Sequence, residues 1–258
     1  MCNNEFVKLS KLDSQDKQQS NIRISVCMAT YNGEKYIEEQ IKSILNQLSI
    51  NDEVIISDDN SIDNTIRIIE NLKDNRIKIF YNQSQKGYTR NFENALNHSS
   101  GDVIFLSDQD DVWIEGKVEN VLRKLENSTL VVTDAEVTDG NLLTLYKSHF
   151  ENSGVKTGFW INFIKTRYIG ACLAFKRELL SKALPFPKKQ SLCQHDYWIV
   201  IVAEFYYKVS LIRIPYIKYR RHGANASNGG LTKSSNSFIK KILVRVYCLF
   251  NLILRVFY

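Results

Sequence analysis

The sequence lacks the cysteine spacing that marks a zinc site or a disulfide framework. Its five cysteines are odd in number and widely scattered, and no two of them have the C-x-x-C spacing. An apolar N-terminal signal segment is also missing. We therefore expect a protein of the reducing cytoplasm.

Two common phosphate-binding loops are absent as well. Neither G-x-G-x-x-G nor G-x-x-x-x-G-K-[ST] occurs, which argues against a dehydrogenase of the dinucleotide-binding type and against a P-loop NTPase. A sugar-nucleotidyltransferase would carry a basic, glycine-rich loop near its N-terminus, and residues 29–35 do not form one.

Acidic residues are absent from the last part of the chain, where the positive charge is concentrated. The net charge is +6, and the stretch from Pro215 to the end contains eight Lys and Arg and no Asp or Glu. A uniformly basic surface would indicate nucleic acid as the partner. A nearly neutral body with a basic tail indicates a membrane surface instead, and no nucleic acid.

The first half of the chain alternates between strand-like and helix-like segments. Short apolar runs predict strands at Ile22–Met28, Glu53–Ser57, Ile77–Tyr81 and Val103–Ser107. Apolar residues at helical spacing predict helices over 34–47, 62–72 and 88–98. This order predicts the α/β class, with a mostly parallel central sheet and helices on both faces.

The second half is less regular. A strand near Leu130–Thr133 is followed by a polar, irregular stretch through Asn152. We then expect the following elements: a helix over Phe159–Lys165, a strand over Tyr168–Phe175, an apolar helix from His195 to about Tyr207, and a strand over Val209–Tyr219.

Both ends of the chain differ from the body in composition. Residues 1–21 are polar and are expected to be disordered. The folded domain is expected to span 22–228. Residues 229–258 comprise a Gly/Ser/Asn-rich linker and a basic amphipathic C-terminal helix.

The predicted C-terminal helix covers Phe238–Tyr258. Its polar residues fall on one arc at 100° per residue, and apolar residues cover the remainder; the arc contains Lys240, Lys241, Arg245, Asn251 and Arg255. Four cations make a bilayer span unfavourable. We expect this helix to lie in the lipid interface; the alternative is an ordinary helix packed on the body.

Polar residues follow three of the predicted parallel strands, at the edge of the sheet where ligands bind in such folds. These residues are Ala29-Thr30-Tyr31, Asp58-Asp59 and Asp108-Gln109-Asp110. Oxygen ligands from Asp108, Asp110 and Asp111 suit a hard divalent cation shared with substrate phosphates. The alternative is an acidic turn in which one Asp caps a helix beginning near Trp113.

Several motifs in combination resemble a known family. These motifs are Ser25–Gly33, Ser57–Ser61, Ser107–Trp113 and His195–Asp196. Together they resemble the inverting family-two glycosyltransferases of the GT-A fold, a Rossmann-like nucleotide-diphospho-sugar transferase fold. Within that family they resemble bacterial enzymes of surface-polysaccharide assembly, including rhamnosyltransferases. The resemblance runs from about residue 22 to 228, and it implies a nucleotide-binding half (22–113) and an acceptor-side half (114–228).

The resemblance implies a set of residues that bind the nucleotide sugar. They are Ala29, Thr30, Tyr31, Asp59, Arg90 and Asp108. Physically, Tyr31 can stack on the base and Asp59 can accept a hydrogen bond from a base N–H. Asp108 matches the family's ribose-side aspartate. For Arg90 the alternative is a solvated helix residue.

The resemblance also implies a metal site and a catalytic base. Asp110 matches the ligand that bridges Mg²⁺ or Mn²⁺ to the diphosphate, and His222 matches a third ligand or a diphosphate contact. Asp196 occupies the position of the base that deprotonates the acceptor hydroxyl, with helix capping as its structural alternative. One base and direct displacement imply inversion at the anomeric carbon.

Three residues are assigned to the acceptor side: Gly170, His195 and Trp198. Many relatives have Glu-Asp where this chain has His195-Asp196. Gly170 would let an acceptor approach the sheet closely. The tryptophans Trp113, Trp160 and Trp198 are candidate sugar-stacking surfaces, and buried core is the alternative for each.

These assignments predict a glycosyltransferase that takes a dTDP- or UDP-sugar and extends a lipid-linked glycan at the inner face of the cell membrane. One alternative is a haloacid-dehalogenase-like phosphatase, because Asp108-Gln-Asp-Asp-Val112 fits its D-x-D-x-V pattern. That family places the motif after the first strand, whereas here it follows the fourth. Another alternative is a non-catalytic, membrane-associated protein that binds sugar nucleotides, although binding alone needs no base.

Overall fold

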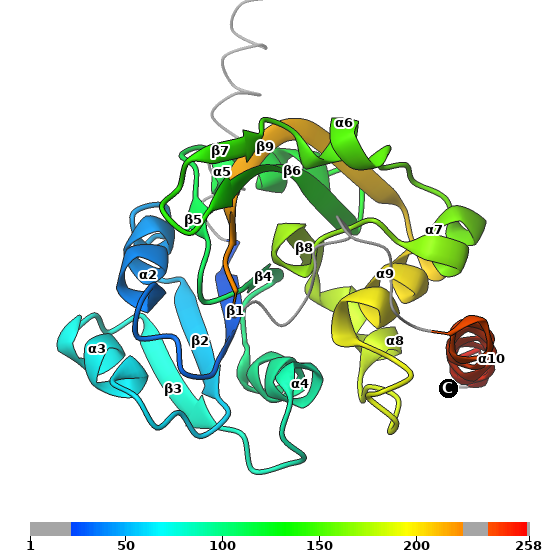
Figure 1. Ribbon diagram of the computed structural model, residues 1–258, viewed down its shortest axis with the longest axis horizontal. Helices are drawn as coiled ribbons and strands as arrows, with labels where there is room; N and C mark the ends of the chain where they lie inside the picture. The colour runs from blue at the N-terminus through cyan, green and yellow to red at the C-terminus, as the bar shows by residue number, and fades with distance from the viewer. Residues whose placement is uncertain (1–21, 224–236, 257–258) are drawn as a thin grey trace, which may run out of the picture.

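The first half of the chain forms a parallel four-stranded unit in the computed structural model, which describes residues 22–223 and 237–256 (Figure 1). The strands occur in the order β3-β2-β1-β4, and every neighbouring pair is parallel. Their bounds are β1 (Ile24–Thr30), β2 (Glu53–Asp58), β3 (Ile77–Tyr81) and β4 (Val103–Ser107). β2 and β4 are buried along their whole length, as expected for strands covered on both faces.

Helices α2 (Ile37–Leu45), α3 (Thr65–Asn71) and α4 (Tyr88–His98) connect these strands. Figure 1 shows α2 and α3 on one side of the parallel strands and α4 on the other. Apolar residues of α2 at helical spacing are fully buried in the core. The helix predicted over 62–72 begins later in the structure: Ile62 precedes α3 and is 88% exposed.

The second half continues the same sheet in the order β4-β8-β6-β9-β5, with β7 paired to β6. The bounds are β5 (Val112–Trp113), β6 (Leu130–Asp139), β7 (Thr144–Tyr146), β8 (Leu173–Lys176) and β9 (Val209–Arg221). β6 and β9 are parallel, whereas β8 is antiparallel to both β4 and β6. The α/β class is confirmed, and the uninterrupted parallel order is a property of the first half.

Three local predictions in the second half were wrong. Trp113 begins no helix: it lies in β5, which pairs with β9, and α5 (Lys117–Leu125) starts later. The strand predicted over Tyr168–Phe175 is shortened by the 3-10 turn η1 (Gly170–Cys172). The stretch through Asn152 is not irregular throughout, because it contains the end of β6, then β7 and α6 (His149–Ser153).

The remaining helices are α7 (Phe159–Lys165), the 3-10 turn η2 (Arg177–Leu179), α8 (Leu180–Ala183), α9 (His195–Tyr206) and α10 (Phe238–Leu254). Residues 197–203 of α9 are all buried, which explains the nearly continuous apolar sequence of that helix. The predicted segment 1–21 and residues 229–236 of the linker lie outside the described residues. Within the described part of the chain, no helix has the length and apolar character needed to cross a bilayer.

Candidate active site

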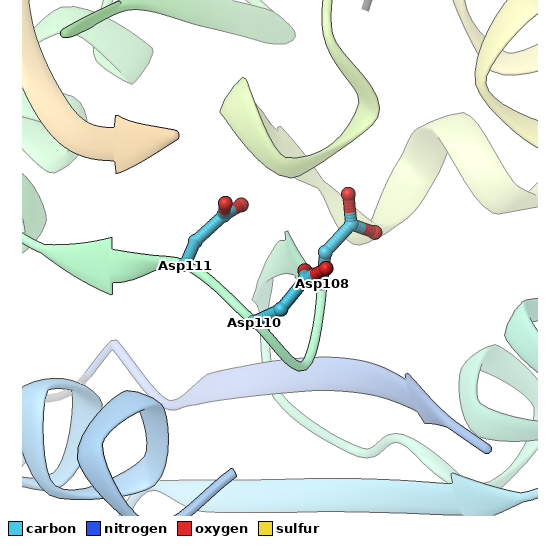
Figure 2. Close-up of side chains that lie close together, drawn as sticks. All are labelled: Asp108, Asp110 and Asp111. Atoms are coloured by element: carbon cyan, nitrogen blue, oxygen red, sulfur yellow. The ribbon is translucent and has the colours of Figure 1, made fainter. Parts of the chain in front are cut away.

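Three carboxylates gather in the loop between β4 and β5. Figure 2 shows Asp108, Asp110 and Asp111 extending from this loop. One oxygen of each lies within 4.8 Å of the others, so we call these three residues the acid cluster. The parallel register places Thr30 beside Asp58, and Met28 beside Ser107, which ends β4. The acid cluster therefore projects from the same edge of the sheet as the ends of β1 and β2.

His222 joins the acid cluster from far along the chain. β9 pairs with β5, which brings the residues after β9 against the residues before β5. His222 Nε2 lies 2.8 Å from Asp110 Oδ2, and the backbone N–H of Arg220 donates to Asp111 Oδ1 at 3.0 Å. The ring of Tyr36 contacts both His222 and Arg220. Its centre lies 4.8 Å from the centre of the His222 ring and 4.3 Å from the guanidinium carbon of Arg220.

Burial and mutual repulsion make the acid cluster costly without a cation. Burial, followed by the charges of Asp110 and Asp196, raises the pKa of Asp108 to about 7. Burial also raises the pKa of Asp111 well above its usual range. The second carboxylate oxygen of Asp111 is buried without a hydrogen-bond partner among the described residues. Carboxylate oxygens with one imidazole fit Mg²⁺ or Mn²⁺, so this donor set suits the predicted ion.

A fully buried lysine lies beneath the acid cluster, and sequence reasoning missed it. Lys117 Nζ donates to the carbonyl of Ala171 at 3.2 Å and lies 4.1 Å from the centre of the Trp113 ring. Burial lowers the pKa of Lys117 to about 7, against the opposing influence of Asp111 and Asp108. Nothing in the local sequence distinguishes this lysine from the solvated ones elsewhere, because its burial results from β5 and η1.

Tyr31 lies at the tip of β1 with an exposed side chain, 50% accessible to solvent. Its backbone is held by the side chain of Gln109: the Tyr31 N–H donates to Oε1 at 2.9 Å, and Nε2 donates to the Tyr31 carbonyl at 3.0 Å. A Cβ on Gly33 would lie 2.5 Å from that same Oε1, so glycine is needed for the approach. Gln109 lies within the motif that suggested the acid cluster, yet no role was assigned to it.

The start of α9 faces the acid cluster. The charge of Asp196 contributes to the raised pKa of Asp108 and also to that of Tyr88, so Asp196 lies near both groups. A Cβ placed on Gly170 would lie 3.3 Å from Asp196 Cβ and 3.5 Å from His195 Nε2. The structure thus brings the predicted residues Gly170, His195 and Asp196 together beside the acid cluster.

The sequence and fold can now be set against known proteins. The family model described as Glycosyl transferase family 2 matches residues 25–184, more than half of the chain. This chain belongs to glycosyltransferase family 2. The dTDP-rhamnosyl transferase RfbG of Shigella flexneri is 31% identical over 78% of this chain and 75% of its own length. The Escherichia coli UDP-Glc:alpha-D-GlcNAc-diphosphoundecaprenol beta-1,3-glucosyltransferase WfgD is 27% identical over 89% and 92%.

Solved structures agree on the fold. S. aureus TarS (residues 1–349) in complex with UDP-GlcNAc superposes with a TM-score of 0.68 at 19% identity, covering 92% of this chain and 73% of TarS. In another TarS structure the chain spans 60% of the TarS length. The predicted GT-A fold and family are therefore confirmed. The comparisons give no support to the phosphatase or to the non-catalytic alternative.

Other residues predicted on the nucleotide side of this family-2 enzyme have structural partners. Thr30 is buried, and its hydroxyl donates to Asp58 at 2.8 Å; Ala29 precedes it within β1 and packs against the core. The carboxylate of Asp59 accepts hydrogen bonds from Asn82 Nδ2 at 2.8 Å and from the Gly87 N–H at 2.7 Å. Each carboxylate oxygen of Asp59 keeps a second lone pair for a ligand.

Arg90 contacts other parts of the protein. Its guanidinium pairs with Glu93 and donates to the carbonyls of Pro187 at 2.8 Å and Lys188 at 2.7 Å. The residue is therefore not a solvated helix arginine. In this structure it ties α4 to the loop that leads into α9, and its predicted contact with the nucleotide stays a prediction.

The tryptophan assigned to the acceptor side lies in the core instead. Trp198 is fully buried, and its indole N–H donates to the carbonyl of Ala183 at 2.8 Å. No face of the ring is open to a sugar, because α9 is covered on all sides at this position. His195 is also buried, yet neither of its ring nitrogens has a hydrogen-bond partner among the described residues, and its ring stacks on Phe92 at 4.1 Å.

Proposed function

We propose that this family-2 glycosyltransferase moves a sugar from a dTDP- or UDP-linked donor to a hydroxyl of a lipid-linked glycan, with inversion and with the help of a divalent cation. The observation that carries the proposal is the position of Asp196 at the start of α9, directly beside Gly170 and close enough to Asp108 for their charges to interact. Glycosyl transfer needs two sites: a cation that stabilises the leaving group, and a base that accepts the proton of the attacking hydroxyl.

The ligands for the cation would come from Asp110, Asp111 and His222. Asp110 and His222 are already in contact, and Asp111 has an unpartnered buried oxygen. When bound, Mg²⁺ or Mn²⁺ supplies Lewis acidity that stabilises the charge developing on the nucleoside diphosphate. The remaining residues bind the rest of the donor: the exposed ring of Tyr31 stacks on the base, Asp59 accepts from the base, and Asp108 accepts from the ribose.

Asp196 would act as the base. Its Oδ1 accepts from the N–H of Tyr197 at 2.7 Å, which fixes the carboxylate at the start of α9. The side chain is half-buried, so it can receive the proton of an acceptor hydroxyl while remaining shielded from bulk water. Gly170 lets η1 lie directly against the start of α9, because an added Cβ would come within 3.3 Å of Asp196 Cβ. Direct attack by one hydroxyl inverts the anomeric carbon.

The location that fits this acceptor is the cytoplasmic face of the cell membrane. A lipid-linked glycan keeps its lipid in the bilayer, so the enzyme must work close to the surface. The basic C-terminal helix α10 supports this placement, because cations near an apolar helix favour anionic lipid. The name of WfgD, which specifies a diphosphoundecaprenol acceptor, also supports it.

Two variants at opposite sides of the site test the proposal, with Asp102→Asn at the far edge of the sheet as the control. Asp110→Asn should abolish the thermal shift that Mn²⁺ produces with UDP-glucose or dTDP-rhamnose. Asp196→Asn should keep that shift and lose transfer by about 10²–10⁴-fold. Near-normal turnover of Asp196→Asn would contradict its role as base. A product that keeps the anomeric configuration of the donor, read by NMR, would contradict inversion.

A further inference from the structure

The C-terminal helix α10 is docked with its cationic arc toward the protein. Arg245 donates to the carbonyl of Ile164, and Arg255 donates to the carbonyl of Leu184 at 3.1 Å. Cys248 and Leu252 are buried between these arginines. The sequence predicted either a membrane helix or a helix packed on the body, and the structure shows packing through one face only. Lys240 and Lys241, at the start of the helix, remain exposed.

The opposite face of α10 is apolar and open to solvent. Its residues are between 39% and 76% exposed and comprise Phe238, Ile239, Ile242, Leu243, Val246, Phe250, Ile253 and Leu254. An amphipathic helix on a globular protein normally buries such residues and exposes its charges. A contiguous apolar face of this kind indicates an interaction surface.

A second helix extends this apolar face. Trp160, Ile161 and Ile164 of α7 are exposed, Trp160 by 67%. Arg245 links the two helices through the carbonyl of Ile164, and Figure 1 shows α7 and α10 on the same side of the molecule. We call the outward residues of α7 and α10 together the apolar surface. Its aromatic member Trp160 is of the kind enriched where protein meets lipid headgroups.

The charge around the apolar surface identifies its partner. Segments 156–167 and 238–256 contain no acidic residue and seven cations. Arg245 and Arg255 face the body, and the other five are Lys156, Lys165, Arg167, Lys240 and Lys241. A second copy of the chain would bring the same cations face to face, because a two-fold interface pairs a patch with itself. An anionic bilayer offers the opposite charge together with an apolar interior.

We propose that the outward faces of α7 and α10 form one surface that lies in the headgroup region of an anionic bilayer. This proposal rests on the proposed function in one respect: a membrane surface would deliver the lipid-linked acceptor. The exposure and charge of α7 and α10 support it independently. The surface is joined to the site by Arg245, whose guanidinium lies 5.4 Å from the centre of the Tyr197 ring, next to Asp196. A membrane bound here would hold the base at a fixed height above the lipid.

The test is co-sedimentation of the full chain with phosphatidylcholine vesicles that contain or lack phosphatidylglycerol. Trp160→Glu/Ile164→Glu on α7 and Ile242→Glu/Val246→Glu on α10 should each weaken binding to anionic vesicles by about tenfold or more. The matched control is Ile50→Glu/Ile62→Glu, because both residues are highly exposed and lie outside the apolar surface. The control should bind like the wild type.

Three results would overturn the proposal: equal binding of the α7 variant and the wild type, equal binding to both vesicle types, or a wild-type dimer that the variants convert to monomer. The last result would assign the apolar surface to self-association. Release of nucleoside diphosphate from the donor in solution is measured in parallel. Loss of vesicle binding with normal release separates a failure at the surface from a failure of the proposed function.

Discussion

Two groups of carboxylates lie at opposite edges of the same parallel strands, and their surroundings differ sharply. At the amino edge, Asp52 accepts from the Ile24 N–H at 2.8 Å, and Glu53 accepts from Ser25 Oγ at 2.6 Å and from the Ser100 N–H at 2.7 Å. At the carboxyl edge, the acid cluster brings three carboxylates within 4.8 Å of one another.

The pKa values follow this difference. Burial alone would raise the pKa of Glu53, but hydrogen bonds from Lys78, Ser25 and Ser100 outweigh it and lower that pKa to about 2. Burial with neighbouring carboxylates instead raises the pKa of Asp108 to about 7. Hydrogen-bond donors therefore dominate the surroundings of Glu53, whereas burial and neighbouring carboxylates dominate those of Asp108, as expected at a candidate functional site.

The largest expected effect concerns the cation. Mn²⁺ at a hundredfold excess over its Kd should stabilise the wild type by about 2.7 kcal/mol. Asp111→Asn should lose most of this gain while unfolding no more easily without metal, because the substitution removes a buried charge and keeps the acceptor for the Arg220 N–H. Thermal unfolding with and without Mn²⁺ measures both quantities. An undiminished Mn²⁺ response in Asp111→Asn would remove this residue from the metal site.

For Glu53, at the amino edge, we expect a loss of stability without a loss of Mn²⁺ binding. Glu53→Gln should destabilise the fold by about 2 kcal/mol and leave the Mn²⁺ response intact, because buried donors lose a charged acceptor. The estimate allows for solvent screening at Arg23 and Lys78, whose side chains are 41% and 46% exposed. Urea unfolding measures the difference. Glu119→Gln, in an exposed pair with Arg123, is the control and should change stability little.

The same glutamate predicts how stability responds to acid. The folded pKa of Glu53 lies near 2, below its usual 4.5, so its contribution is fully present above pH 4.5 and is lost as the pH falls toward 2. The stability difference between the wild type and Glu53→Gln should therefore shrink across that range. Urea unfolding at several pH values follows it; a difference that stays constant from pH 5 to 2.5 would contradict the assignment.

The smallest effect on activity should come from Gln109, whose side chain links the end of β4 to the end of β1. Gln109→Ala removes two hydrogen bonds to the backbone of Tyr31 and should raise the KM for the donor by about tenfold, with kcat nearly unchanged. Steady-state kinetics with varied donor concentration separates the two constants. An equal fall in kcat would place Gln109 in the chemistry itself rather than in donor binding.

Much of the first half could be predicted because its signals are local. Each parallel strand is a short apolar run, and α4 was bounded correctly from its helical spacing. The acids after β4 follow a buried strand directly, so the direction of that strand determines at which edge of the sheet they lie. His222, which contacts Asp110 from far along the chain, was predicted from the family resemblance rather than from any periodicity.

What could not be predicted depends on contacts between distant segments. β5 exists because Val112 and Trp113 pair with Lys218 and Ile217 of β9. The role of Arg90 depends on the carbonyls of a loop almost a hundred residues later. The orientation of α10 is likewise set by carbonyls of the body that accept from its arginines. Periodicity gives the faces of a helix but not which of them meets the protein.

The glutamine that joins β4 to Tyr31 has a consequence for how donor preference can change. One side chain connects Tyr31, the proposed platform for the base, to the strand end that carries the carboxylates, so the length of one glutamine side chain sets the span between them. Neither tip can shift without the other. A new base must then be accommodated by exchanging side chains at positions such as 31 or 59, while the distance from nucleoside to pyrophosphate stays constant.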